Sequence, residues 1–212
     1  MRVIGGSVKG RRLSQFRGQD IRPTPDMVRE ALFNILGGEI VNASFLDLFA
    51  GTGGVGIEAL SRGAGQVFFV DNSIKARRII CNNLKLCGFL SSTADIHRDS
   101  ALERCGLTPP DTSIPLRFKF VRNNAIKAIH DLNAMGERFD LIFIDPPYKS
   151  DLYEQTLNII SQSSLLNERG MVIVEHFFKR VLEERYGMLE LNKRVRFGDT
   201  SLSFWRLSHH SL

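Results

Sequence analysis

The sequence predicts a doubly wound α/β protein built on a mostly parallel, seven-stranded sheet. Short apolar segments of strand length alternate along the chain with segments of helical periodicity, which favours parallel βαβ units. A glycine-rich loop joins one apolar strand to a helix, and a later apolar strand stops at two consecutive prolines. Near the C-terminus two alternating segments flank a short turn, so we expect the sheet to end in an antiparallel hairpin.

The composition is that of one large domain with a sizeable core, because 43% of the 212 residues are hydrophobic. No apolar run approaches the roughly 20 residues needed to cross a membrane, and the N-terminus has no hydrophobic signal region. We therefore expect a cytoplasmic protein. Three cysteines follow no metal-ligand spacing, which favours free thiols and predicts no metal site; they are Cys81, Cys87 and Cys105.

The net charge of +5 is concentrated at the N-terminus. Residues 1–22 contain six basic side chains and one acid, whereas the rest of the chain holds 22 basic and 22 acidic groups. Glycines at positions 5, 6 and 10 predict a short β-hairpin, so we divide the chain into a basic arm, residues 1–24, and a main domain, residues 25–212. The arm presents Lys9, Arg11 and Arg12 together. Such an arm is typical of polyanion contact, and a solvated charged terminus is the alternative.

A helix is expected to begin where the arm ends. Thr24 suits the N-cap, Pro25 suits the first helical position, and Asp26 is favourable at the positive end of the helix dipole. Arg22 and Arg29 flank this start and are placed either to reach a phosphate or to remain solvated.

The next segments predict a site for an adenosine-like cofactor. An apolar strand at residues 44–49 runs into a loop that contains Gly51 and Gly53, and a helix follows. Glycines in such a loop let the backbone approach a ligand closely. A second strand, residues 66–70, ends at Asp71, which falls 20 residues after Gly51. An acid at that place can accept hydrogen bonds from both hydroxyls of a ribose.

The glycine spacing also satisfies the dinucleotide fingerprint, which makes a nicotinamide- or flavin-dependent oxidoreductase a rival interpretation. Asp47 argues against it, because this acid lies inside the first strand, four residues before Gly51. There it can meet a cationic amino-acid group, whereas a pyrophosphate gains nothing from a nearby carboxylate.

The following part of the chain is less regular. We expect a helix over residues 73–86, and then a surface insertion over residues 89–117, which contains three prolines and little periodicity. A third strand, residues 117–121, precedes Asn124 and a further helix. A polar residue at the end of this strand is placed to contact an adenine edge.

The most informative motif is a strand, residues 139–144, that ends at Asp145-Pro146-Pro147-Tyr148. Two prolines cannot continue a central strand, because neither has an N–H group for the ladder. A carboxylate and a backbone carbonyl on such a turn can accept both hydrogens of one planar amino group, and an aromatic ring can stack on its base. The motif therefore predicts a holder for the exocyclic amine of a nucleobase. A proline turn with a solvated acid is the alternative.

The C-terminal third predicts a helix over residues 151–163, a fifth strand over residues 171–175 and a helix over residues 177–185. Two further strands then meet at residues 195–200, and residues 201–207 alternate well enough to form the return strand of a hairpin.

Taken in this order, the motifs resemble the bacterial family of small-subunit ribosomal RNA guanine-N2 methyltransferases of the RsmD type. The glycine loop and the Asp-Pro-Pro-Tyr turn alone would indicate an amino-methyltransferase, and the N-terminal segments narrow the resemblance to this family. The similarity spans nearly the whole chain apart from residues 89–117. The matching segments are residues 1–6, 10–13, 22–24, 28–34, 46–53, 58–63 and 145–148.

The resemblance implies a Rossmann-like class I methyltransferase fold with S-adenosylmethionine as methyl donor. It also implies methylation of the exocyclic N2 of one guanine in 16S rRNA, within a partly assembled small ribosomal subunit. By position, it places Asp47, Gly51 and Gly53 at the methionine part of the cofactor, Asp71 at the ribose, Asn124 and Ala125 near the adenine, and Asp145, Pro146 and Tyr148 at the target guanine. The expected RNA contacts are Lys9, Arg11, Arg12, Arg22 and Arg29.

Other functions use parts of the same pattern. An amino-methyltransferase that acts on DNA adenine or cytosine, or on a protein glutamine, would use the same turn, although a separate DNA-reading domain is not evident. A non-catalytic RNA-binding assembly factor would not need the intact Asp-Pro-Pro-Tyr turn. We expect a monomer.

Overall fold

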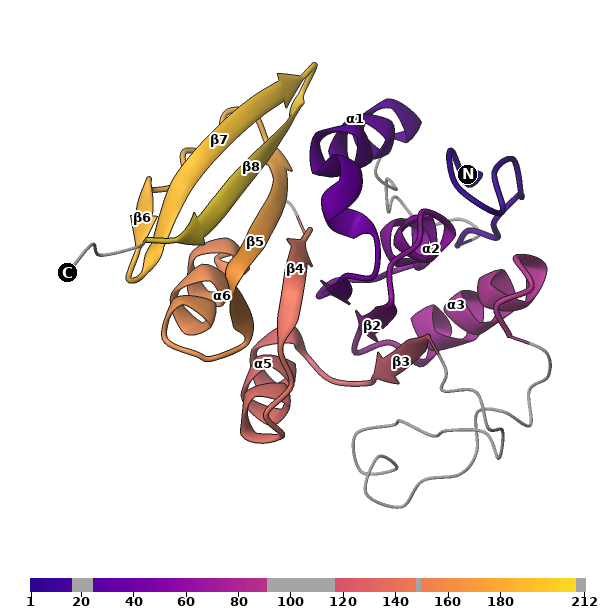
Figure 1. Ribbon diagram of the computed structural model, residues 1–212, viewed down its shortest axis with the longest axis horizontal. Coiled ribbons are helices and arrows are strands. Elements are labelled where there is room, and N and C mark those ends of the chain that lie inside the picture. The colour runs from indigo at the N-terminus through magenta and orange to yellow at the C-terminus, as the bar shows by residue number, and fades with distance from the viewer. Residues whose placement is uncertain (17–24, 91–116, 148–149, 209–212) are drawn as a thin grey trace.

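The computed structural model of the chain describes residues 1–16, 25–90, 117–147 and 150–208. Figure 1 shows a twisted sheet with helices packed on both of its faces. The helices are α1 Asp26–Leu36, the 3₁₀ turn η1 Gly37–Ile40, α2 Gly54–Ser61, α3 Ile74–Leu86, α5 Ala125–Ala134 and α6 Leu152–Ser161. The strands are β1 Ser44–Asp47, β2 Gln66–Val70, β3 Phe118–Val121, β4 Phe139–Ile144, β5 Leu166–Phe177, β6 Arg185–Tyr186, β7 Leu189–Phe197 and β8 Thr200–Leu207.

The sheet has the strand order β3-β2-β1-β4-β5-β8-β7-β6. Strands β1 to β5 pair parallel with one another, and β8 pairs antiparallel with both β5 and β7. The doubly wound architecture with a C-terminal antiparallel hairpin is thus confirmed, and the two-residue β6 adds an eighth strand to the seven expected. The order of the parallel strands reverses between β1 and β4. In open α/β sheets ligands bind outside the carboxyl ends of the strands at this switch point.

Two apolar clusters lie on the two faces of the sheet. Helices α1, α2 and α3 bury their apolar residues against one face, and α5 and α6 bury theirs against the other. Successive strand residues point to opposite faces, so Phe143 belongs to the first cluster and its neighbour Ile144 to the second. By the same alternation Asp145, which follows β4, faces the side of α1 and α2.

The N-terminal residues pair with each other as the glycine pattern predicted. Arg2 and Arg12 form an antiparallel bridge, and the Val3 N–H donates to the Arg11 carbonyl at 2.9 Å. This hairpin is docked on α2, because the Ile4 and Gly5 N–H groups both donate to the Glu58 carboxylate, at 2.8 and 2.7 Å.

The start of α1 differs from the expectation. The helix begins at Asp26, and Pro25 occupies the N-cap position with φ −56° and ψ 144°, so Pro25 precedes the helix. Such extended backbone suits proline, whose φ is restricted to about −65°. The expected capping residue, Thr24, lies outside the described residues.

The prediction of a helix over residues 177–185 is wrong. Strand β5 runs from Leu166 to Phe177, well beyond the expected residues 171–175, and a loop and β6 follow. The apolar spacing of this segment fits a helix, but tertiary hydrogen bonds override it. The Phe178 N–H donates to the Asp199 carbonyl at 3.0 Å, and the Leu182 carbonyl accepts from the Arg194 guanidinium at 3.0 Å.

Among the described residues, no helix is both long and apolar enough to cross a membrane. Cys81 and Cys87 are free thiols, and Cys105 lies outside the part of the chain that the structure describes.

Candidate active site

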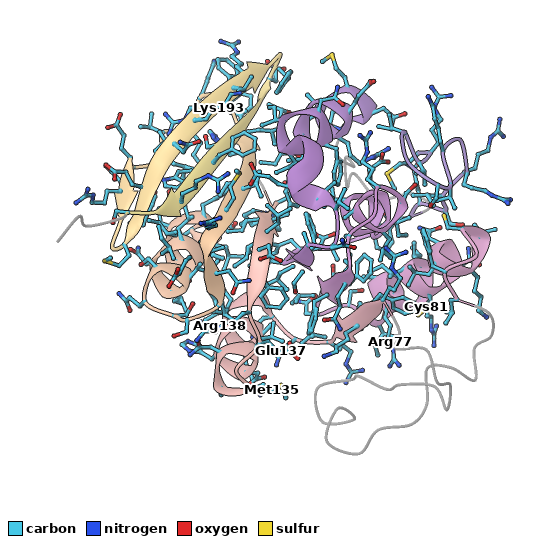
Figure 2. All side chains as sticks on the ribbon, viewed as in Figure 1. Arg77, Cys81, Met135, Glu137, Arg138 and Lys193 are labelled. Carbon is cyan, nitrogen blue, oxygen red and sulfur yellow. The ribbon has the colours of Figure 1, made fainter. Side chains whose placement is uncertain are left out.

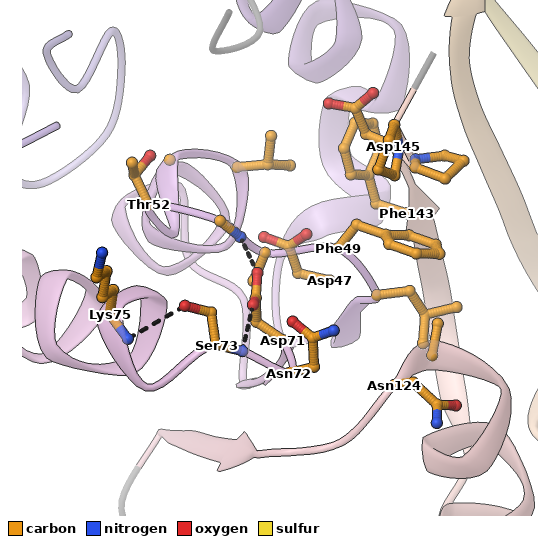
Figure 3. Close-up of a pocket in the computed structure, with 18 of the residues that line it drawn as sticks. Asp47, Phe49, Thr52, Asp71, Asn72, Ser73, Lys75, Asn124, Phe143 and Asp145 are labelled. Atoms are coloured by element: carbon orange, nitrogen blue, oxygen red, sulfur yellow. Dashed lines mark hydrogen bonds between the residues drawn. The ribbon is translucent and has the colours of Figure 1, made fainter. Parts of the chain in front are cut away.

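A cavity of about 1220 Å³ opens at the carboxyl ends of β1, β2 and β4 (Figure 3). Its walls come from the segments that the sequence singled out, because the ends of parallel strands meet at one edge of the sheet. Eight of the predicted site residues line it: Arg29, Asp47, Gly51, Asp71, Asn124, Ala125, Asp145 and Pro146. Gly53 lies behind the wall as the N-cap of α2, where its φ of 77° suits glycine. Tyr148 lies outside the described residues.

Asp47 is the most deeply buried acid of the cavity. It ends β1, is only 2% exposed, and accepts a hydrogen bond from the Gly56 N–H in the first turns of α2 at 3.1 Å. Burial raises the pKa of Asp47 to about 7, the Gly56 N–H lowers it in part, and the nearby charge of Asp71 raises it. A cationic group in the cavity would favour the ionised form of this acid.

Asp71 follows β2 and joins the glycine loop to the start of α3. One carboxylate oxygen accepts from the Gly51 N–H at 2.9 Å, and the other accepts from the Ser73 N–H at 2.8 Å (Figure 3). Burial raises the pKa of Asp71, and these two N–H donors act in the opposite direction. Each carboxylate oxygen has a second lone pair, so the fixed acid can still accept hydrogen bonds from a ligand.

Asn124 lies on the opposite wall and begins α5. Its side-chain oxygen accepts from the Lys127 N–H at 2.8 Å as an N-cap, so the amide nitrogen and the second lone pair of that oxygen are available to a ligand. Ala125 follows it in the wall.

Asp145 and Pro146 form the wall beyond β4. Burial raises the pKa of Asp145 well above its ordinary value, and the negative charges of Glu175 and Asp47 raise it further. Glu175 is the neighbour of Asp145 across the sheet, because Ile144 pairs with Val174 in the preceding position. Glu175 and Asp47 therefore both disfavour ionisation of Asp145.

Two residues behind the proline turn were not predicted from the sequence. The buried Tyr153 hydroxyl donates to the Pro146 carbonyl at 3.2 Å. The Arg180 guanidinium lies 4.4 Å from the centre of the Tyr153 ring and donates to the Ser150 carbonyl at 3.0 Å. These contacts orient the turn that carries Asp145. The sequence signal that could have identified Tyr153 is its position on the apolar face of α6. Arg180 gave no such signal, because it fell in the segment misassigned as a helix.

Four of the five predicted RNA contacts lie within the described residues, and they divide into two groups. Lys9, Arg11 and Arg12 are exposed on the N-terminal hairpin, outside the cavity wall. Arg29 is fully buried, donates to the Arg2 carbonyl and to Asp26, and has its Nε 3.6 Å from a Glu58 carboxylate oxygen. Its burial conflicts with the predicted RNA contact, because Arg29 instead joins the hairpin, α1 and α2.

Arg22, the remaining predicted RNA contact, lies outside the described residues, as does most of the expected insertion over residues 89–117. Among the described residues, no group of three or more His, Cys, Asp and Glu side chains is arranged to hold a metal ion.

Comparisons with known proteins agree with this geometry. A family model described as "Conserved hypothetical protein 95" matches residues 1–111 and 110–206. The chain is 35% identical over 206 residues to YlbH of Bacillus subtilis strain 168, a provisionally named rRNA methyltransferase, and the match covers 97% of this chain and 98% of YlbH. It is 31% identical over 175 residues to ribosomal RNA small subunit methyltransferase D of Escherichia coli K12, covering 82% of this chain and 74% of that protein.

A solved structure with a similar fold is that of yhhF from Escherichia coli, provisionally named a methyltransferase. It superposes with a TM-score of 0.72 at 25% identity and covers 98% of both chains.

Proposed function

Because this chain belongs to the RsmD-type family of ribosomal RNA small subunit methyltransferases, we propose that it methylates the exocyclic N2 amine of a guanine in 16S rRNA, with S-adenosylmethionine as donor. The observation that carries the proposal is the meeting of two sites in one cavity. The first site consists of the Asp145 carboxyl group and the Pro146 carbonyl, which suit an amino group. The second consists of the acids and the glycine loop that suit an adenosine-like ligand, and both line the same cavity.

The residues present fit S-adenosylmethionine. Asp71 would accept hydrogen bonds from the ribose hydroxyls, and Asp47 would pair with the ammonium group of the methionine part. The Gly51 backbone would approach the same part, and Asn124 and Ala125 would border the adenine. When bound, S-adenosylmethionine supplies a sulfonium methyl that is already electrophilic, so the task of the protein is to position the attacking amine.

Asp145 and Pro146 would hold that amine. The Asp145 carboxylate and the Pro146 carbonyl each accept one of its two hydrogens, which turns the nitrogen lone pair toward the methyl group. The Tyr153 hydroxyl uses one lone pair of the Pro146 carbonyl and leaves the other for the amine. An amine that accepted the methyl group would have one proton to release. Asp145 is suited to accept that proton, because its pKa is raised.

Tyr148 would stack on the guanine, and the target base must leave any helix that contains it to reach the cavity. The exposed Lys9, Arg11 and Arg12 would hold flanking phosphates, and Arg22 would extend that contact. Arg29 has no part in this proposal. The substrate would be a partly assembled small subunit, and the enzyme would act as a cytoplasmic monomer.

A methyl-transfer assay tests the proposal. Labelled S-adenosylmethionine would be offered with undermethylated small subunits, with naked 16S rRNA and with duplex DNA, and modified nucleosides would be identified by mass spectrometry. We expect N2-methylguanosine in RNA, and more of it in subunits than in naked RNA. Label in DNA or protein, or on another base, would overturn the substrate assignment. Cofactor binding without transfer to any of them would favour an assembly factor.

Asp145→Ala and Asp145→Asn variants test the mechanism. Both should abolish transfer while binding of S-adenosylmethionine, measured by calorimetry, stays close to that of the wild type. Retained turnover in either variant would remove Asp145 from the mechanism.

A further inference from the structure

Aromatic and cationic side chains gather where β5 ends and the β7–β8 hairpin turns. This rim cluster consists of Phe177, Phe178, Lys179 and Arg196. The two phenylalanine rings meet edge to face with centroids 4.9 Å apart. The Arg196 guanidinium lies 3.7 Å from the centre of the Phe178 ring, and the Lys179 ammonium lies 5.6 Å from it.

The rim cluster adjoins the proposed base holder. Asp145 lies level with Glu175, because Ile144 pairs with Val174, and Phe177 is two residues farther along the same face of β5. Two residues of a strand span about 7 Å. On the other side, Arg180 follows the cluster directly and donates to the Ser150 carbonyl, while the Ser150 N–H donates to the Pro147 carbonyl, each at 3.0 Å.

The cluster is open to solvent and positively charged. Phe177 is 37% exposed although it ends a strand whose preceding six residues are buried. Within the described residues, neither Lys179 nor Arg196 forms an ion pair; Arg196 donates only to the Gly198 carbonyl, at 2.8 Å. Lys193 adds a further exposed cation on β7 (Figure 2).

We propose that the rim cluster binds the single-stranded RNA next to the target nucleotide, by stacking an unpaired neighbouring base on Phe177 and placing flanking phosphates against Lys179 and Arg196. Exposed rings combined with unpaired cations are the features with which proteins bind single-stranded nucleic acid. Arg196 also lies against the Phe178 ring, which contacts the Phe177 ring edge to face. This inference rests on the proposed function, because it extends the substrate-binding surface of the same cavity.

In Figure 1 the N-terminal hairpin and the end of β5 lie on opposite sides of α1, so the two surfaces would contact different parts of the RNA. A rim that only held phosphates would need no exposed ring, and a purely apolar rim would need no cations. The combination is what points to an unpaired strand with accessible bases.

The test uses the full chain and two variants, Phe177→Ala and Arg196→Ala, singly and together. Binding of a fluorescein-labelled single-stranded RNA 12-mer and of naked 16S rRNA would be followed by anisotropy. Loss of one stacked base corresponds to a change of about tenfold in the dissociation constant. We expect each single variant to weaken RNA binding several-fold and the double variant to weaken it at least tenfold, with affinity for S-adenosylmethionine unchanged.

Two control residues lie near the opposite end of β7, Arg185 in β6 and Met188 just before β7. Met188→Ala removes an exposed apolar side chain, and Arg185→Ala removes an exposed cation. Both should bind RNA as the wild type does. Wild-type RNA affinity in a folded double variant would overturn the inference and leave the rim cluster as a brace for the hairpin.

The inference and the proposed function fail separately. If the double variant binds RNA weakly while the wild type transfers no methyl group, the rim is supported and the proposed reaction is overturned. If the wild type forms N2-methylguanosine and the double variant does so with unchanged KM and kcat, the reaction is supported and the rim is overturned. If the Phe177→Ala variant melts several degrees below the wild type, Phe177→Leu replaces it, because leucine keeps most of the apolar volume and removes the ring. RNA binding by Phe177→Leu with the affinity of the wild type would also overturn the proposed stacking on Phe177.

Discussion

Replacing Asp47 by asparagine should stabilise the free protein at alkaline pH and weaken cofactor binding. Asparagine keeps a side-chain oxygen that can accept a hydrogen bond from the Gly56 N–H group. The main effect of the substitution is therefore to remove the negative charge. The pKa of Asp47 is raised from 3.8 to about 7 in the folded state because burial disfavours the charge. Each of these roughly three pH units corresponds to about 1.4 kcal/mol, so the ionised acid lowers stability by about 4 kcal/mol.

The sign of the pH dependence follows from proton uptake. Between pH 3.8 and about 7 the folded state holds a proton on Asp47 that the unfolded state has lost. The wild type therefore becomes less stable relative to Asp47→Asn as pH rises through this window, and the difference is constant above it. We expect the variant to be more stable by about 4 kcal/mol at pH 8 and by about 1 kcal/mol at pH 4.5. For a chain of this length, 4 kcal/mol corresponds to a rise in Tm of about 10 °C.

Urea unfolding at the two pH values measures both differences. Asp199→Asn, at the exposed turn of the hairpin, is the matched control and should show no such gain. A difference between Asp47→Asn and the wild type that is the same at pH 4.5 and pH 8 would refute the reasoning, because it could not arise from ionisation. The same titration predicts that wild-type affinity for S-adenosylmethionine rises about tenfold between pH 6 and pH 8, and that Asp47→Asn loses this dependence.

Three further predictions concern the remaining contacts. Asp71→Ala should weaken S-adenosylmethionine binding, measured by calorimetry, by about 30-fold, since it leaves the Gly51 and Ser73 N–H groups without their acceptor. Unchanged affinity would remove Asp71 from the ribose site. Neutralising Lys9, Arg11 and Arg12 together should reduce the slope of log affinity for RNA against log salt by about 2, and an unchanged slope would make the hairpin an ordinary charged terminus. Tyr153→Phe should lower kcat about fivefold, since it removes the hydrogen bond that orients the Pro146 carbonyl, and cofactor affinity should be unchanged. A variant that loses stability but keeps the wild-type kcat would contradict this positioning role.

The elements that position the site could be predicted from local signals. The bounds of β2 and β4 agree with the sequence, because each is a short apolar run that stops at an acid or at prolines. The meeting of Asp47, Asp71 and Asp145 followed from one rule, that the carboxyl ends of parallel strands lie at the same edge. Strand β1 proved two residues shorter than expected, since Leu48 and Phe49 already belong to the turn toward the glycine loop.

What could not be predicted depends on contacts between distant segments. Glu175 became relevant only because β5 pairs with β4, and Arg180 because a loop after β5 reaches the segment that follows the proline turn. Arg29 has the position of an exposed helix residue near a basic arm, yet its partners, Arg2 and Glu58, come from the hairpin and from α2. A pattern of apolar spacing contains no information about such partners, which also explains the helix wrongly assigned to residues 177–185.

The acids of the cavity favour a cationic ligand over the rival nicotinamide interpretation. Asp47 and Asp145 have raised pKa values, and in each case burial is the largest cause and the charge of another acid adds to it. Ionising them in the free protein is unfavourable, and a ligand with an ammonium and a sulfonium group would relieve that cost when it binds. The anionic pyrophosphate of a dinucleotide would increase it instead. The glycine spacing alone fits both ligands, so the buried acids beside the glycines are the part of the site that distinguishes them.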